Sequence, residues 1–214
     1  MLTLDQAAVH LQSSGNYALL DFAGAEMQLA GTGEVLFEGN GSRNWLRPLV
    51  ATGTLTIDSG ITIHGPNSGV VGANNVSIVN RGRIVAEAGS NVTVQAPSVR
   101  NEGVLEALSA GILSLTNLLN AGLLNADVGG VASIAGPFTL PPAGLIQISI
   151  AGVLATEFGR INVSGLASLD GVIRPILSSE FIPALGQTFR VMTFGSRAGS
   201  FASVEDGNPG DGVY

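Results

Sequence analysis

The chain of 214 residues contains no cysteine and no lysine, and aromatic residues make up only 5% of it. Without cysteine it can form no disulfide, thiolate nucleophile or cysteine-bound metal site. The formal net charge is −7. Because nucleic-acid binding rests on clustered positive charge, we expect no nucleic-acid partner. The scarcity of aromatics means that Val, Ile, Leu and Ala must fill the core, which suits narrow, regular layers.

The sequence also lacks an export signal and a membrane-spanning segment. Met1–Gln6 has neither the basic start nor the apolar run of a signal peptide, so we expect any export signal to lie outside this chain. Val128–Thr156 carries no charge and exceeds the roughly 20 apolar residues that cross a bilayer. However, glycines and prolines interrupt it, and polar residues alternate with Ile146, Ile148 and Ile150, which is the period of a strand. We therefore predict no membrane span in this chain.

Glycine, in contrast, is abundant at 30 residues, and it recurs within a repeated unit, Asn-x-Gly-x-[Ile/Leu]-x-Ala. The unit occupies Asn80–Ala86, Asn101–Ala107 and Asn120–Ala126, and its copies start 21 and 19 residues apart. Self-similarity at about 20 residues is typical of solenoids, whose units bury an apolar face only by stacking on each other. We predict a structural ladder along the stack, formed by Asn80, Gly82, Asn101, Gly103, Asn120 and Gly122.

Each residue type in this ladder has an expected role. Asparagine tolerates left-handed backbone angles at a turn, and stacked asparagines can pass amide hydrogen bonds from coil to coil. The glycine two positions later is expected to make the bend tight. Arg81 and Glu102 occupy equivalent positions, so we expect an exposed ion pair between adjacent coils. Gly33–Val35, Gly53–Leu55 and Gly144–Ile146 keep the glycine and the apolar residue and extend the series.

Two further apolar segments accompany each unit. A short alternating strand follows the glycine, as in Val92–Val94, Leu113–Leu115 and Ala132–Ile134, and apolar residues precede each asparagine. Three short strands and three turns per coil predict an all-β fold, a right-handed single-stranded parallel β-helix (β-solenoid) with coils of about 20 residues. A leucine-rich repeat has a similar period, but its frame fits none of the three units.

The pattern divides the chain into three parts. Within residues 1–16, Thr3–Leu11 has apolar residues at helical spacing after a capping-box start, which predicts a short N-terminal capping helix over the first coil. Residues 17–158 hold the solenoid repeats. Residues 159–214 change pattern and are predicted to form a closing β module that continues the solenoid.

The closing module carries a resemblance to a known group of proteins. Its segments are Ile161–Gly165 (INVSG), Leu169–Ile173 (LDGVI), Phe181–Phe194 (FIPALGQTFRVMTF) and Gly199–Phe201 (GSF). This order, after Asn-x-Gly repeats, resembles the β-solenoid passenger segments of bacterial autotransporter-like and filamentous-haemagglutinin-like surface proteins. The resemblance implies secretion, an extracellular or cell-surface location and a structural or adhesive role. It supplies no catalytic residues.

One cluster is suited to contact a partner. Trp45 lies beside Arg43 and Arg47, and an exposed tryptophan with arginines can stack on a sugar or a protein. The partners we expect are a host or environmental glycan or protein, or a second copy of the chain. No cofactor is predicted, although Asp206–Asp211 has oxygen ligands at roughly calcium-like spacing.

The main alternative is a fragment of a β-helical polysaccharide-active enzyme, a lyase or a hydrolase. Such an enzyme needs side chains for proton transfer or metal binding. Asp58, Glu106 and Asp127 are the carboxylates that could face a groove, but solvated surface charges explain them as well. His10 and His64 stand in no metal-ligand or triad pattern. We therefore predict a protein that is not an enzyme.

Overall fold

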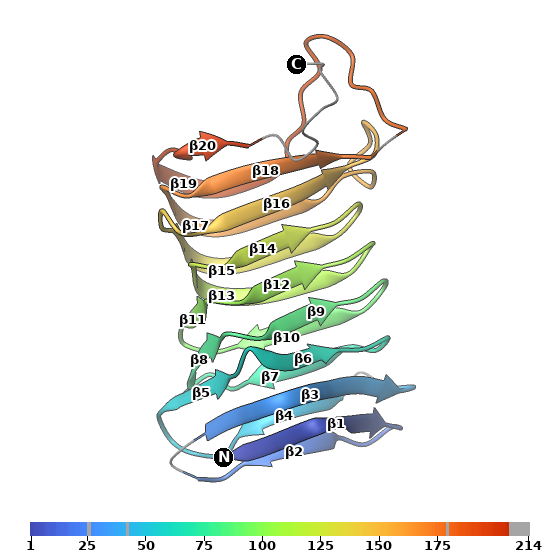
Figure 1. Ribbon diagram of the computed structural model, residues 1–214, viewed down its shortest axis with the longest axis vertical. Coiled ribbons are helices and arrows are strands. Elements are labelled where there is room, and N and C mark those ends of the chain that lie inside the picture. The colour runs from blue at the N-terminus through green and yellow to red at the C-terminus, as the bar shows by residue number, and fades with distance from the viewer. Residues whose placement is uncertain (25–26, 42, 179, 206–214) are drawn as a thin grey trace.

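The computed structural model describes residues 1–24, 27–41, 43–178 and 180–205. Within these ranges all the secondary-structure elements are β-strands. The strands form coils that stack along the long axis of the molecule (Figure 1). All pairings between the named strands are parallel. The prediction of an all-β fold made of stacked parallel strands is confirmed.

Each coil contributes to three faces. Face A contains β5 (Thr54–Ile57), β8 (Ser77–Asn80) and β11 (Val99–Asn101). Face B contains β6 (Gly60–His64), β9 (Arg83–Ala86), β12 (Val104–Ala107), β14 (Leu123–Ala126), β16 (Leu145–Ile150), β18 (Val172–Leu177) and β20 (Ser203–Val204). Face C contains β2 (Ala18–Phe22), β4 (Asn44–Pro48), β7 (Gly69–Gly72) and β10 (Asn91–Gln95).

Six longer strands turn a corner and belong to two faces. By their pairing, β1 (Leu2–Ser13) and β3 (Met27–Gly39) run over faces A and B. The other four, β13 (Ile112–Asn120), β15 (Val131–Leu140), β17 (Arg160–Leu169) and β19 (Met192–Gly199), run over faces C and A. The three-strand coil expected from the repeat is therefore present.

Aliphatic side chains fill the interior in columns, with one member from each coil. The inward column of face B is buried along its length and is connected by the strand register: Val35, Ile63, Ile84, Leu105, Leu124 and Ile146. Phe37 and Phe138 are the bulkiest fully buried side chains. Burying one such side chain is worth about 1.5–3 kcal/mol, so the stack gains its stability coil by coil.

Coil length differs along the stack. In the middle, Asn80, Asn101 and Asn120 lie in register at separations of 21 and 19 residues. Near the two ends, Leu2 pairs with Leu29 and Leu140 pairs with Leu169, which makes those coils longer than the middle ones. The repeat that is visible in the sequence is therefore the regular centre of the solenoid.

The predicted N-terminal capping helix is wrong, because Leu2–Ser13 forms strand β1 and pairs with β3. Leu4 and Leu11 are both buried, although an odd separation places them on opposite sides of a regular strand. The register shifts between Asp5 and Ala7, and Gln6 there has a φ of 49°. This bulge reverses the alternation and turns both leucines inward. The spacing that indicated a helix belongs to a bulged strand.

The extended repeat series is partly wrong as well. Val35 and Ile146 do lie in register with the apolar residues of the central units. Leu55, however, pairs with Ile78 on face A, and the equivalent residue on face B is Ile63. Thr54 and Leu55 therefore belong to the strand before the corner, and Gly53 precedes that strand.

The parallel stack continues through the C-terminal coils. Strand β18 pairs with β20, and β17 pairs with β19, so residues of the predicted closing module extend the same faces. The loop with possible calcium ligands, Asp206–Asp211, lies outside the described residues. In the described ranges, no helix exists that could cross a membrane.

Candidate functional site

The corner between faces A and B holds the asparagine ladder. Asn80 donates from Nδ2 to Oδ1 of Asn101 over 2.8 Å, and Asn101 donates in the same way to Asn120 over 2.7 Å. The three side chains are fully buried. Each amide also donates to backbone carbonyls of its own coil and the next, for example Asn101 to Leu123 O over 3.0 Å. These bonds join successive coils inside the core, where an unsatisfied polar group is costly.

The glycines at this corner are required by close stacking of the backbone. A Cβ at Gly103 would lie 2.2 Å from the carbonyl oxygen of Gly82, and one at Gly122 would lie 2.2 Å from that of Gly103. No side chain fits at such a distance without moving the backbone. These glycines do not have the left-handed φ angles of many turn glycines. The glycine was expected to make the bend tight. Instead, the close approach of the backbones of successive coils is what requires glycine at these positions.

The asparagines do not use left-handed angles either. Among the described non-glycine residues, positive φ angles occur at Gln6, Ala110 and Asn117. The amide hydrogen bonds, which were the second expected role, are therefore what the structure shows for the ladder residues.

The expected ion pair outside this corner is confirmed. Arg81 Nε lies 3.0 Å from Oε2 of Glu102, and Arg100 Nε lies 2.5 Å from Oε1 of the same carboxylate. The hydrogen bonds from Arg81 and Arg100 lower the pKa of Glu102. Because all three groups are partly exposed, the cluster adds little stability and mainly favours the correct register.

The Arg43–Trp45–Arg47 segment lies on face C in the first coils. Trp45 points outward but is half-buried, and its Nε1 donates to the carbonyl of Gly72 over 2.7 Å. Its ring lies 6.2 Å from that of the exposed Tyr17. The guanidinium carbons of Arg47 and Arg43 lie 5.5 Å and 5.3 Å from the ring centres of Trp45 and Tyr17 respectively. Two cation–π contacts thus hold a small aromatic surface in place.

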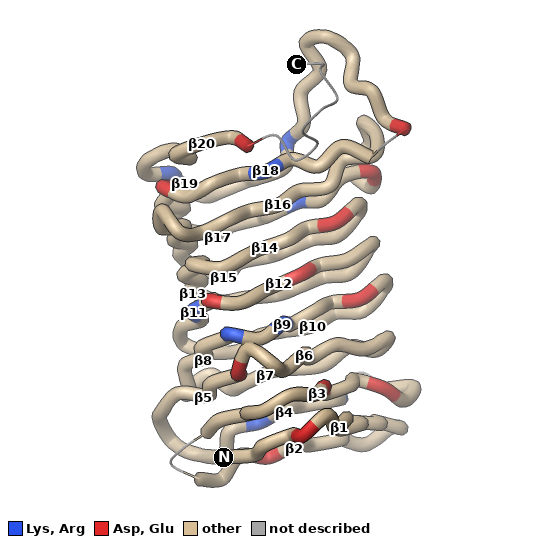
Figure 2. Tube along the Cα trace, viewed as in Figure 1, with Lys and Arg blue, Asp and Glu red and all other residues tan. Residues whose placement is uncertain are grey.

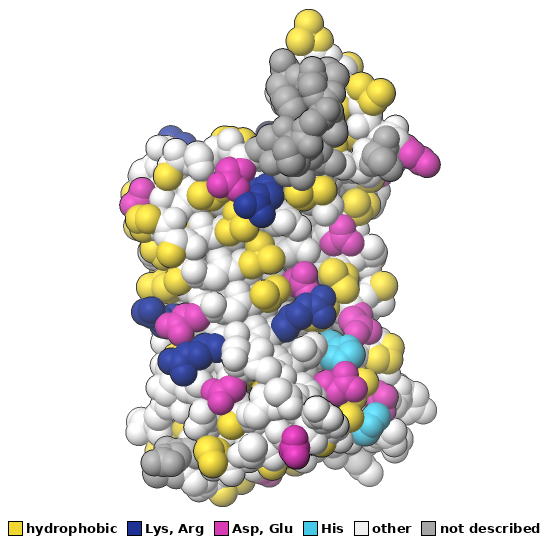
Figure 3. All heavy atoms as spheres, viewed as in Figure 1, with side chains coloured by type: hydrophobic (Ala, Val, Ile, Leu, Met, Phe, Trp, Pro, Cys, Tyr) yellow, Lys and Arg dark blue, Asp and Glu magenta, His cyan; other side chains and the backbone are white. Residues whose placement is uncertain are grey.

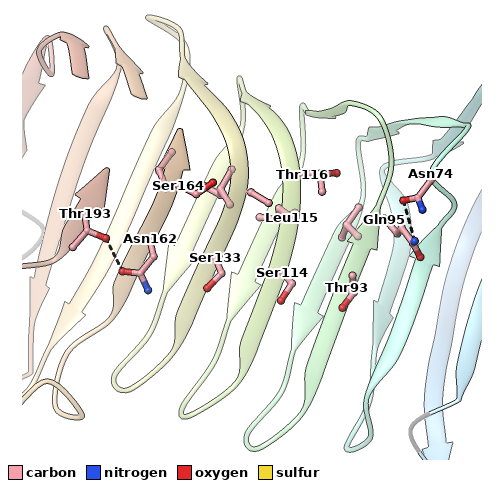
Figure 4. A pocket seen from close by; sticks show the side chains of 14 residues that line it. Asn74, Thr93, Gln95, Ser114, Leu115, Thr116, Ser133, Asn162, Ser164 and Thr193 are labelled. Atoms are coloured by element: carbon pink, nitrogen blue, oxygen red, sulfur yellow. Dashed lines mark hydrogen bonds between the residues drawn. The ribbon is translucent and has the colours of Figure 1, made fainter. Parts of the chain in front are cut away.

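Farther along face C lies a groove with a volume of about 740 Å³. Figure 4 shows its polar side chains on successive strands. Thr93 pairs with Ser114, Ser114 with Ser133, Ser133 with Asn162 and Asn162 with Thr193. We call these five residues the hydroxyl column. Its members are one strand spacing apart, about 4.8 Å, along the solenoid axis.

Three hydroxyls of this column are free to bind a ligand. Within the described chain, the side chains of Thr93, Ser114 and Ser133 have no hydrogen-bond partner, whereas Thr193 donates to Oδ1 of Asn162 over 2.9 Å. A second row borders the column, and there Gln95 donates to Asn74 over 2.9 Å. The groove has a size common for ligand sites and carries uncommitted donors and acceptors.

A histidine and two carboxylates meet on face B. His64 lies 2.6 Å from Oε1 of Glu87 and 2.9 Å from Oε2 of Glu34, through its two ring nitrogens. Figure 3 shows imidazoles beside acidic side chains on this face. Burial lowers the pKa of His64, but the hydrogen bonds to Glu87 and Glu34 outweigh it and raise the pKa above its ordinary value of 6.5. The group joins three successive coils.

The carboxylates considered for catalysis each have a partner close by. Asp58 accepts hydrogen bonds from Gln28 at 3.0 Å, Glu106 forms an ion pair with Arg83, and Asp127 accepts one from Ser109 at 3.4 Å. Figure 2 shows acidic and basic residues scattered over the coils. In the described part of the chain, no group of three or more His, Asp or Glu side chains could hold a metal ion.

Sequence reasoning missed the hydroxyl column. The sequence does contain a pattern that indicates the column: Thr93, Ser114 and Ser133 are the middle residues of the three alternating strands that follow the repeat glycines. In a strand with both neighbours buried, the middle residue points outward. Comparison of these positions, in addition to the corner positions, reveals the column.

A second missed residue is Asn44, which is fully buried at the start of β4. Its Oδ1 accepts from the amide of Ser13 at 3.1 Å, and its Nδ2 donates to the carbonyls of Glu38 and Ser68, both at 3.1 Å. It thus joins three coils as the ladder asparagines do. No repeat in the sequence indicates it, because the N-terminal coils differ in length.

Comparisons with known proteins identify no relative. No family model, curated protein or solved structure matches this chain.

Proposed function

We propose that this chain is a right-handed single-stranded β-helix that serves as a non-enzymatic structural or adhesive segment of a bacterial protein, on the cell surface or secreted from the cell. The closing module's resemblance to autotransporter-like and filamentous-haemagglutinin-like passenger segments supports the location. The parallel stack of coils supports the role as a rod that holds contact residues in place.

The observation that carries this proposal is the combination of an internally bonded rod with an outward aromatic pair, the exposed Tyr17 and the half-buried Trp45. Asn80, Asn101 and Asn120 tie the coils together from inside, so the outward side chains are free to vary. Tyr17 is 59% exposed and, with Trp45 and its flanking arginines, offers a preformed contact surface. Large aromatic side chains beside arginines are typical of binding surfaces.

The pairing of the carboxylates supports a role without catalysis. Glu102 is held by two arginines and Glu106 by one. The described lining of the face C groove carries neutral polar and aliphatic side chains, whereas glycoside hydrolysis uses two carboxylates beside the bond to be cleaved. The polysaccharide-active alternative therefore finds little support in this groove.

Adhesion is tested with beads that carry the purified chain. We expect them to be retained on immobilised mucin or on immobilised bacterial polysaccharide more than beads that carry albumin. Trp45→Ala should reduce the retention, and Leu49→Ala, an exposed apolar residue of the same region, should leave it unchanged. No retention on any surface would contradict the adhesive role.

Catalysis is tested separately with the same preparation. We expect no release of reducing ends from polygalacturonate, xylan or mucin glycans over the level of buffer. Reproducible cleavage that Glu106→Gln or Asp127→Asn abolishes would overturn the proposal in favour of a polysaccharide-active enzyme.

A further inference from the structure

Resting on the proposed adhesive function, the geometry points to a specific ligand and a specific place: the face C groove binds an uncharged polysaccharide chain that lies along the solenoid axis. The groove is built on β10, β13, β15, β17 and β19, and the hydroxyl column forms its floor. Three properties of the groove lead to this ligand.

The first property is its chemistry. The described lining contains Ser, Thr, Asn, Gln and aliphatic side chains, with no charged group. A charged polymer would lose its hydration there without gaining an opposite charge, which is costly. The free hydroxyls of Thr93, Ser114 and Ser133 each donate and accept, as sugar hydroxyls do. The hydroxyls of an uncharged sugar can therefore form hydrogen bonds with the hydroxyls of the groove, one with each.

The second property is its repetition. The hydroxyl column presents one polar side chain per coil, at the strand spacing of about 4.8 Å. A small ligand would use one or two of these groups and leave the others in water. An extended chain with hydroxyls along its whole length can use them all.

The third property is that the backbone under the groove is already paired. Strand β13 is bonded to β10 on one side and to β15 on the other. An extended peptide that binds by adding a strand needs a free sheet edge, and the groove floor offers none. This favours a ligand recognised through side chains.

The same outward row also contains an aromatic ring. Strand register connects Trp45 to Val70 and Val70 to Thr93, so the tryptophan lies on the line of the hydroxyl column, toward the N-terminus. Its ring can stack on the apolar face of a sugar, while the hydroxyl column bonds the sugar hydroxyls. A bound chain would thus run from Trp45 toward Asn162.

The test is a titration of the full chain with neutral hexasaccharides, namely cellohexaose, mannohexaose and maltohexaose, and with charged hexagalacturonate. We expect saturable binding of at least one neutral hexasaccharide and at least about tenfold weaker binding of hexagalacturonate. Ser133→Glu should weaken the neutral ligand by about tenfold or more, because a desolvated carboxylate fills the groove. Thr139→Glu, an outward position of β15 on face A, is the matched control and should change nothing.

Several outcomes overturn the inference. They are no binding of any neutral hexasaccharide, equal loss of binding in the Thr139→Glu control, or saturable binding of gelatin in place of the sugars. Bead retention separates this inference from the proposed function. If wild-type beads are retained but Ser133→Glu binds the neutral hexasaccharide as tightly as wild type, the groove inference fails while adhesion stands. If wild-type beads are not retained but the hexasaccharide still binds at the groove, the adhesive role fails while the binding site stands.

Discussion

One inward column at the corner between faces A and B changes character along the solenoid. In the N-terminal coils it is apolar, with Leu29 in register with Ile57. In the middle it becomes Asn80, Asn101 and Asn120. Toward the C-terminus, Leu140 and Leu169 pair and make it apolar again. The same place in the fold is therefore filled by two kinds of side chain.

The two kinds of column contribute to the fold in different ways. Stacked aliphatic side chains gain from burial but tolerate sliding, because the hydrophobic effect has no direction. In the stacked asparagines, Asn80 donates to Asn101 and Asn101 to Asn120, and a shift of register that broke such a buried hydrogen bond would be costly. The middle coils, with only 19 to 21 residues each, are thus held in one register, and the longer end coils can vary.

Replacement of a corner glycine should produce the largest effect. Gly103→Val places a Cβ 2.2 Å from the carbonyl of Gly82 and forces the two coils apart, at a cost of about 3 kcal/mol in the free energy of unfolding. Urea unfolding measures this. Gly89→Ala is the control: its Cβ meets nothing within 4 Å, so only its φ of 76° opposes the change, at a cost of about 1 kcal/mol. Equal costs would show that stacking does not select glycine at the corner.

The two kinds of column are compared directly by one substitution in each. Asn101→Leu removes the acceptor of Asn80 and the donor to Asn120, and should cost about 2 kcal/mol. Ile57→Val, in the apolar part, should cost about 1 kcal/mol. Both are measured by urea unfolding. A smaller loss for Asn101→Leu than for Ile57→Val would contradict the role given to the ladder.

The pH dependence of stability tests the His64 group, which joins the N-terminal coils to the first of the middle coils. The pKa of His64 is higher in the folded chain than the ordinary 6.5, so its contribution is fully present below that value. It is lost as the pH rises through the raised pKa. We therefore compare the free energy of unfolding of wild type with that of His64→Gln at about pH 5 and at about pH 9. The advantage of wild type should be smaller at the higher pH, by less than about 1 kcal/mol. Parallel stability curves for the two proteins would refute the assignment.

The smallest effect is expected at the exposed ion pairs of the middle coils. In Arg81→Gln, Glu102 keeps its ion pair with Arg100. The free energy of unfolding, measured by thermal unfolding, should therefore fall by no more than about 0.5 kcal/mol. The difference should vanish in high salt, which screens exposed charges. A large, salt-independent loss would mean that the cluster, and not the ladder, holds the register.

Much of the fold could be predicted where the coils are regular. The Asn-x-Gly unit indicated stacking at about 20 residues, and the strands around it followed from alternation. Prediction failed at the N-terminus, because the bulge at Gln6 reverses the alternation of Leu4 and Leu11 and imitates helical spacing. Gly53–Leu55 was wrongly assigned to the repeat series. In these longer coils the corner between faces A and B lies farther along the chain from the glycine, and Leu55 pairs on face A. Both failures are irregularities of the backbone, which a residue pattern does not record.

The candidate site could be predicted only in part for a related reason. Trp45 and its arginines stand out by residue type within one short segment. The hydroxyl column consists of ordinary residues, and it is distinctive only because the register aligns Thr93, Ser114, Ser133 and Asn162.

The stacked parallel coils could be predicted from the residues alone, because the apolar faces of the repeat can be buried only against their neighbours. So could the asparagines and glycines that form the ladder. The three-dimensional arrangement was needed to show what the ladder residues contact and which outward side chains lie side by side. This is because the glycine contact, the amide ladder and the hydroxyl column all join residues from different coils, and only the strand register brings these residues close together.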